Sequence, residues 1–217
     1  MARLRGHKYN GAINRVKIEN DTVYTVDDGQ GYLKQHNLFD EIPDFFREAD
    51  YIVFDPPWNG GNLKSFYTKA DLVLDQEWFG FIDRIFELMR TLKVNSCYME
   101  FGEQYLNLAV ERMNEVFDNV RVIESRYYNK HKCYFVIGEN EGHEIELENV
   151  IKDELKVIDE IISKKDGRVL DFCLGRGAVS RTAYKYKKPF IGTELNINRL
   201  AVSYEDLVKM GAKIDRL

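Results

Sequence analysis

The chain has few of the residues that mark secreted or metal-binding proteins. Its cysteines, Cys97, Cys133 and Cys173, are odd in number and far apart, and its four histidines show no ligand spacing. This pattern excludes a disulfide framework and a zinc site, and it favours reduced thiols in a cytoplasmic protein without a metal. No run of 18 apolar residues is present, and the basic stretch 1–8 has no apolar core, so we expect neither a membrane span nor a secretion signal.

Positive charge is also scarce for a protein that binds nucleic acid. The formal net charge is −5, and residues 139–160 hold nine acids against two lysines, a local net charge of −7. The rest of the chain therefore carries a net charge of +2. This distribution excludes a strongly basic surface, but it permits one face that tolerates phosphates.

What is present is the pattern of an α/β domain. With 217 residues, 44% of them hydrophobic, the chain is long enough for one sizeable core. Helices alternating with short apolar strands predict a doubly wound, mostly parallel sheet. Two β-rich runs over 119–138 predict an antiparallel edge hairpin, and the mixed residues 59–76 predict a long functional loop. Further predicted strands are two or three over 12–38, the last of them 32–38, then 51–54, 94–101, 168–171 and 189–194; predicted helices are 40–49, 77–91, 103–117, 149–164, 178–186 and 196–210.

The first motif is the run 51–58, in which four apolar residues end in Asp55, Pro56, Pro57 and Trp58. Proline continues neither a strand ladder nor a helix, so a buried strand is expected to deliver a rigid tip. An acid, a stiffened backbone carbonyl and a flat aromatic side chain suit a planar ring that bears an amino group. The alternative is a turn acid at a strand end, followed by a core aromatic.

The second motif, over residues 169–177, places Asp171, Gly175 and Gly177 between a predicted strand and a predicted helix. Glycine lets a backbone approach a ligand closely, because it has no side chain and tolerates positive φ. Glu194 ends the next predicted strand, where an acid can hold both hydroxyls of a ribose. Together these residues favour an adenosine ligand, with a plain tight turn as the alternative.

The two motifs resemble those of S-adenosylmethionine-dependent amino-group methyltransferases. Residues 55–58 look like the catalytic DPPW motif, and residues 171–177 with Glu194 resemble the cofactor site. Because the catalytic motif precedes the cofactor loop, the order is similar to that of the circularly permuted β class of DNA amino-methyltransferases. The resemblance implies a permuted, Rossmann-like single domain over 1–217, with N-terminal strands and a short helix in 1–50, a catalytic half in 51–148 and a cofactor-binding half in 149–217.

The resemblance also implies a reaction, methylation of the N6 amine of adenine in DNA, with S-adenosyl-L-methionine (SAM) as the cofactor. Asp55 and the carbonyl of Pro56 would accept the two N–H groups of the amine, while Trp58 stacks on a base that has left the duplex. The residues expected to bind the cofactor are Asp171, Cys173, Gly175, Gly177, Glu194, Asn37 and Phe54, and those expected to bind nucleic acid are Asn59, Tyr127, Tyr128 and Lys130.

Two alternatives stay open. DPPW also resembles the motif of RNA adenine methyltransferases, so RNA is a second possible substrate. Cys173 and Arg176 depart from the usual cofactor loop, which motivates a degenerate methyltransferase fold that binds nucleic acid or a catalytic partner. No separate block of residues remains to recognise a DNA sequence, which favours a homodimer or a partner that supplies specificity. The recognition sequence, and adenine against cytosine as the target, are not determined by the sequence.

Overall fold

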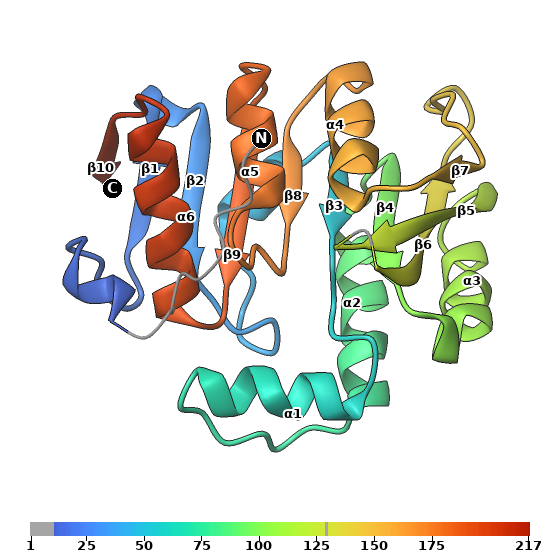
Figure 1. The fold of residues 1–217 in the computed structure, drawn as a ribbon, viewed down its shortest axis with the longest axis horizontal. Coiled ribbons are helices and arrows are strands. Elements are labelled where there is room, and N and C mark those ends of the chain that lie inside the picture. The colour runs from blue at the N-terminus through green and yellow to red at the C-terminus, as the bar shows by residue number, and fades with distance from the viewer. Residues whose placement is uncertain (1–10, 129) are drawn as a thin grey trace.

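The computed structural model describes residues 11–128 and 130–217, and in them ten strands form one sheet (Figure 1). From one edge to the other the strands are β10 (Ile214–Arg216), β1 (Val23–Val26), β2 (Gly31–Gln35), β9 (Phe190–Glu194), β8 (Val169–Asp171), β3 (Tyr51–Phe54), β4 (Ser96–Phe101), β6 (His131–Glu139), β5 (Asn119–Tyr127) and β7 (Val150–Ile151). The helices are α1 (Gly60–Lys69), α2 (Trp78–Leu92), α3 (Leu106–Asn114), α4 (Glu154–Lys164), α5 (Ala178–Lys185) and α6 (Ile197–Lys209), with 3-10 turns at Ala12–Asn14, Asp27–Gly29, Asp44–Glu48 and Glu103–Tyr105.

The centre of the sheet is parallel and its flanks are antiparallel. β2, β9, β8, β3 and β4 pair in parallel, whereas β1 pairs with β10 and β5 with β6 in antiparallel ladders. The predicted doubly wound sheet with an antiparallel hairpin is therefore confirmed. The hairpin does not form the sheet edge, however, because the two-residue strand β7 pairs with the outer side of β5.

Both faces of the sheet are covered, which explains why the central strands are continuous apolar runs. All four residues of β3 are buried, and alternate side chains enter different cores. Tyr51 and Val53 pack in the core beneath α4, α5 and α6, while Ile52 and Phe54 pack in the core that includes α2. Successive side chains of a strand point to opposite faces, so residue 55 continues the face of Tyr51 and Val53.

The prediction of a long loop over 59–76 was wrong, because residues 60–69 form α1. The side chain of Asn59 accepts a hydrogen bond from the Asn62 backbone and caps the helix. Leu63 and Tyr67, four residues apart, supply its buried stripe. A stripe this narrow, beside glycine and lysine, does not stand out as a helical period.

Other boundaries also differ from the prediction. The helix predicted over 40–49 is a 3-10 turn at Asp44–Glu48, and the helix predicted over 103–117 is a 3-10 turn at Glu103–Tyr105 followed by α3. The helix predicted over 149–164 begins at Glu154, because Asp153 caps it and the preceding residues 150–151 form β7. The strand predicted over 32–38 ends at Gln35. The short strand β10 was not predicted, and it adds to the edge of β1.

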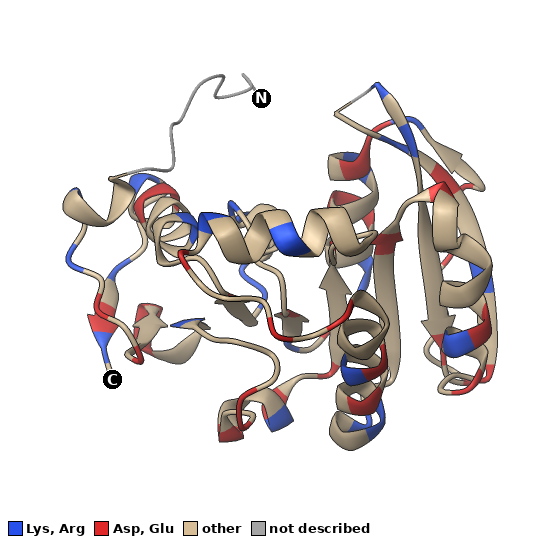
Figure 2. Ribbon diagram, turned by 90° about the horizontal axis from the view of Figure 1, so that it is seen from below, with Lys and Arg blue, Asp and Glu red and all other residues tan. Residues whose placement is uncertain are grey.

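Helix α1 crosses the edge of the sheet at which the parallel strands end (Figures 1 and 2). Its charged residues are Lys64 and Lys69, and it contains no acid. Figure 2 shows this helix in the middle of the view as a tan and blue segment. The helix closest to this edge is therefore positively charged, although the chain as a whole is acidic.

Candidate active site

A cavity of ≈ 1230 Å³ opens where the central strands end. Its wall includes Asn37, which follows β2, Asp55, which follows β3, and Asp171 and Glu194, which end β8 and β9. In open α/β sheets the carboxyl ends of parallel strands form the usual ligand crevice. Residues that are distant in the sequence thus meet in one wall because their strands are neighbours.

Asp55 is the central acid of this cavity. One of its oxygens, Oδ1, accepts a hydrogen bond from the indole Nε1 of Trp58 at 2.8 Å. Burial raises the pKa of Asp55 to about 7, although the Trp58 hydrogen bond and the nearby charge of Arg199 oppose that rise. The carboxyl group therefore changes charge near neutral pH, where a small change in its surroundings decides its state.

The backbone of the Pro56–Pro57 tip is held by residues outside the motif. The indole Nε1 of Trp78, at the start of α2, donates a hydrogen bond to the carbonyl of Pro57 at 2.7 Å. The ring of Trp58 rests against Gly102, where any Cβ would overlap it. Sequence reasoning missed Trp78, for which the only signal was an indole at the start of a predicted helix.

Asp55 and Pro57 line the cavity, whereas Pro56 and Trp58 are outside its wall. The ring of Trp58 lies edge-on to that of Tyr127, with centroids 5.3 Å apart. The indole predicted to stack on a base thus has a different observed contact, its hydrogen bond to Asp55.

Trp58→Phe is expected to raise the pKa of Asp55 above about 7, because the variant loses a hydrogen bond that favours the ionised carboxylate. An NMR titration of the Asp55 carboxyl carbon measures this change. Trp78→Phe is the matched control, since it removes an indole hydrogen bond from the same loop that does not reach Asp55. Equal titration curves for Trp58→Phe and the unmodified protein would contradict the assignment.

The loop after β8 closes on two further acids. Asp171 Oδ1 accepts the backbone N–H of Cys173 at 2.9 Å. Glu194 accepts the N–H of Gly175 at 2.7 Å on Oε2 and that of Asn196 at 2.9 Å on Oε1. Burial raises the pKa of both acids, that of Asp171 well above its usual range. A carboxylate offers about four lone pairs, so Glu194 retains acceptor capacity for a ligand hydroxyl.

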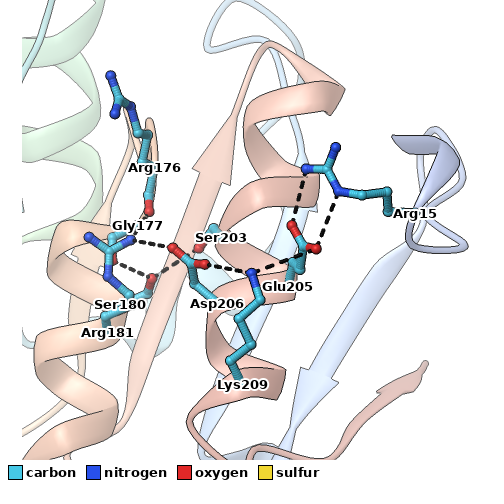
Figure 3. A network of polar contacts seen from close by, with 9 residues as sticks. All are labelled: Arg15, Arg176, Gly177, Ser180, Arg181, Ser203, Glu205, Asp206 and Lys209. Carbon is cyan, nitrogen blue, oxygen red and sulfur yellow. Dashed lines mark hydrogen bonds and ion pairs between the residues drawn. The ribbon is translucent and has the colours of Figure 1, made fainter. Parts of the chain in front are cut away.

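Gly177 shows why this loop requires glycine. Its φ is 74°, and a Cβ there would overlap the hydroxyl oxygens of Ser180 and Ser203. These hydroxyls lie 3.2 Å apart and join α5 to α6 (Figure 3). Ion pairs extend the connection along α6 to Arg15, which follows the first 3-10 turn; they involve Arg181, Asp206, Lys209, Glu205 and Arg15.

Gly177→Ala is expected to lower the free energy of unfolding by roughly 1–3 kcal/mol, because positive φ and overlap with the serines combine. Chemical denaturation measures the loss. Gly211→Ala is the matched control, since Gly211 has a φ of 101° but no atom of the described chain within 4 Å of an added Cβ. A loss no larger than that of the control would show that the serine contacts are unimportant.

Helix α1 is fixed to the side of the cavity that holds Asp171 and Glu194. The hydroxyl of Tyr67 donates to Asn37 Oδ1 at 3.1 Å, and Asn196 Nδ2 donates to the carbonyl of Lys69 at 2.5 Å. The guanidinium of Arg199 lies 4.7 Å from the ring centroid of Phe66. Six of the seven residues predicted to bind the cofactor line the cavity: Asn37, Phe54, Asp171, Cys173, Gly175 and Glu194. Gly177 is outside the cavity wall.

The opposite side of the cavity is aromatic and acidic. Tyr127 and Tyr128, with ring centroids 4.3 Å apart, line it together with Lys130. The predicted residue Asn59 does not line the cavity, because it caps α1. Glu100, on β4, also lines this side. Sequence reasoning missed it, although an acid within a predicted buried strand was an available signal.

No family model and no curated protein matches the sequence. Solved structures do match. M1.HpyAVI superposes with a TM-score of 0.58 at 16% identity, covering 81% of this chain and 97% of that one. The PvuII cytosine-N4-specific DNA methyltransferase superposes with a TM-score of 0.55 at 10% identity, covering 80% and 85%. The chain has a DNA methyltransferase fold.

A third similar structure is TTHA0409, a candidate DNA modification methylase of Thermus thermophilus. It has a TM-score of 0.56 at 12% identity and covers 75% of this chain and 88% of that one. Both TTHA0409 and M1.HpyAVI have also been solved as complexes with SAM.

Proposed function

We propose that the protein is a SAM-dependent methyltransferase that acts on the N6 amine of adenine in DNA. The observation that carries this proposal is the shared cavity. Asp55, from the DPPW motif, and Asp171 and Glu194, from the glycine-loop region, line one wall although β3 and β8 are distant in the sequence. The DNA methyltransferase fold and the SAM complexes of two similar structures support it.

The residues of the cavity fit a cationic nucleoside. Asp171 and Glu194 are buried and Asp55 is half-buried. Removal from water raises the pKa of all three acids, so a positive charge between them offsets the cost of ionising them. When bound, SAM supplies an electrophilic methyl group on a sulfonium. Glu194 would hold the ribose hydroxyls with its remaining lone pairs, and α1 would cover the ligand with Leu63, Phe66 and Tyr67.

The other side of the cavity would receive the target base. Asp55 would accept one N–H of the amine and stabilise the positive charge that develops on nitrogen. The Pro56 carbonyl would accept the other, in a loop whose shape Trp78 fixes through Pro57. Tyr127 and Tyr128 offer ring faces for a base that has left the duplex.

The strand order supports the permuted arrangement that the motif order predicts. β8, which carries the glycine loop, is the eighth strand in the sequence but lies between β9 and β3 in the sheet. The strand β3, which ends at the catalytic motif, thus precedes β8 in the chain, although the two strands are neighbours in the sheet.

The proposal is tested by incubating the protein with SAM carrying a deuterated methyl group and with duplex DNA, single-stranded DNA or RNA. Mass spectrometry of the released nucleosides is expected to show labelled N6-methyladenine in DNA. Labelled N4-methylcytosine would instead move the target to cytosine, and labelled RNA would move the substrate class. No label in any nucleic acid, together with no calorimetric binding of S-adenosylhomocysteine, would support a degenerate fold and reject the enzyme.

Methyl transfer is expected to fall as the pH drops below about 7, because a protonated Asp55 cannot accept both the Trp58 and the amine hydrogens as a carboxylate does. The midpoint of the fall in kcat/KM for SAM should lie near pH 7. The midpoint of the fall in kcat should lie at lower pH, because a bound cation favours ionised Asp55. Initial rates between pH 5 and pH 8 measure both. A rate that is constant below pH 7 would contradict the role of Asp55.

A further inference from the structure

Glu100 is the unexplained acid of the cavity. It lies near the end of β4, where the register that pairs Phe54 with Met99 sets it beside Asp55 on the same face of the sheet. Its exposed fraction is 3%, and its Oε1 has no hydrogen-bond partner among residues 11–128 and 130–217. Buried side-chain oxygens in proteins almost always have a partner, so this atom points to a ligand.

The groups around Glu100 are themselves acidic or weakly polar. Burial raises the pKa of Glu100 most, and the charges of Asp55, which follows β3, and of Glu154 on α4 raise it further. The Cys133 thiol on β6 hydrogen-bonds to it, and the phenol of Tyr127 on β5 faces the same space.

The two neighbouring acids are therefore unequal. Asp55 receives the indole N–H of Trp58 and the attraction of Arg199, and both favour its ionised form. Burial, together with the like charge of Asp55 across the strand pair, raises the pKa of Glu100 well above its usual range. Like charges at one site separate the two titrations, with Asp55 as the carboxylate and Glu100 as the carboxylic acid.

We propose, on the basis of the function proposed above, that Glu100 donates a hydrogen bond to the ring nitrogen beside the target amine. Asp55 and Glu100 together then present an acceptor and a donor side by side. Glu100 is a specificity-determining residue in this arrangement, because it contacts the base rather than the methyl group.

At the Watson–Crick edge, where the adenine N6 and cytosine N4 amines lie, the pattern matches two bases only. Adenine presents the N6 amine donor beside the N1 acceptor, and cytosine presents the N4 amine donor beside the N3 acceptor. Guanine and thymine present a carbonyl acceptor beside a ring N–H donor, which would set acceptor against Asp55 and donor against Glu100. A site that leaves buried polar groups unpaired rejects such a ligand strongly. In this orientation the pair thus admits adenine and cytosine and rejects guanine and thymine.

Glu100→Gln and Glu100→Met separate the possible roles. Glutamine retains an N–H donor at every pH, whereas methionine has a similar length and no donor. On adenine DNA, we expect Glu100→Gln to retain methyl transfer within about threefold and Glu100→Met to lose roughly 10–100-fold. Rates of the unmodified protein should fall at alkaline pH as Glu100 ionises, and Glu100→Gln should lose that fall. Glu139→Gln is the matched control, a buried acid on β6 outside the cavity wall.

DNA containing 1-deazaadenine supplies the decisive comparison, because it retains the amine and lacks the N1 acceptor. The unmodified protein is expected to lose roughly 10–100-fold on this substrate, and Glu100→Met is expected to transfer equally slowly to both DNAs. If cytosine is the target, 3-deazacytosine replaces it.

Three outcomes overturn this inference while leaving the proposed function intact. If Glu100→Met discriminates between the two DNAs as strongly as the unmodified protein does, Glu100 does not contact the ring nitrogen. Glu100→Gln as inactive as Glu100→Met would assign a proton-accepting role instead, and an alkaline fall retained in Glu100→Gln would assign that fall to another group. If the unmodified protein methylates no DNA, the proposed function fails first and this inference fails with it.

Discussion

Asp55→Asn is expected to lower methyl transfer by on the order of 1000-fold, while it raises the melting temperature at pH 8. The loss follows because asparagine has no negative charge to stabilise the amine. The gain in stability follows because burial raises the pKa of Asp55 in the folded protein to about 7, from 3.8 in an exposed carboxyl group. The free energy of unfolding of the unmodified protein is therefore highest below pH 4 with respect to this group, and it falls as the pH rises through 7. Asparagine does not ionise, so the variant avoids that loss.

Thermal melts at pH 5 and pH 8, beside nucleoside mass spectrometry, test both halves of this prediction. The difference in melting temperature between Asp55→Asn and the unmodified protein should be larger at pH 8 than at pH 5. Asp166→Asn, at a side chain that is 96% exposed, is the control and should change neither activity nor this difference. Activity within tenfold of the unmodified protein would remove Asp55 from the reaction.

Glu194→Ala is expected to weaken binding of S-adenosylhomocysteine by at least about 100-fold. The variant loses the acceptor of two backbone hydrogen bonds, from Gly175 and Asn196, and these position the loop and the start of α6. It also removes the lone pairs that would hold the ribose. Hydrogen bonds to a charged group are worth about 1.5–3 kcal/mol each, so losing two or more exceeds a hundredfold change in Kd.

Isothermal calorimetry measures this affinity directly. Glu205→Ala is the matched control, because Glu205 is an acid on α6 whose observed ion pairs, to Arg15 and Lys209, lie away from the loop. Glu194→Gln should fall between the two variants, since its amide retains one acceptor oxygen. Unchanged affinity in Glu194→Ala would place the ribose elsewhere.

The sequence was most informative where one short segment carries the whole signal. The β3 strand and its DPPW tip lie within eight consecutive residues, and the glycine loop with its strand is equally compact. Local physics determines such units, because buried strands are apolar on both faces and prolines end them. The main sheet and both motifs were therefore predictable. Helix α1 was not, since its stability depends on packing Leu63 and Tyr67 against residues far away in the sequence.

The missed site residues share one physical cause. Glu100 becomes a partner of Asp55 only through the register of β3 and β4, and Trp78 reaches Pro57 only because α2 returns to the strand ends. Trp58 shows the same limit, since a sequence reveals an aromatic beside an acid but not a hydrogen bond between them. Motifs can be read one segment at a time, whereas a side-chain partner on another strand requires the assembled sheet.

The position of β8 and β9 has a consequence for how the protein is made. These strands fill the space between β2 and β3, yet they are synthesised more than a hundred residues later. While the ribosome completes the chain, the N-terminal strands have two open edges, the arrangement most prone to pair with other chains. Folding is thus expected to wait for the last quarter of the chain. A break in an exposed loop before α4 should yield two fragments that become stable only by associating.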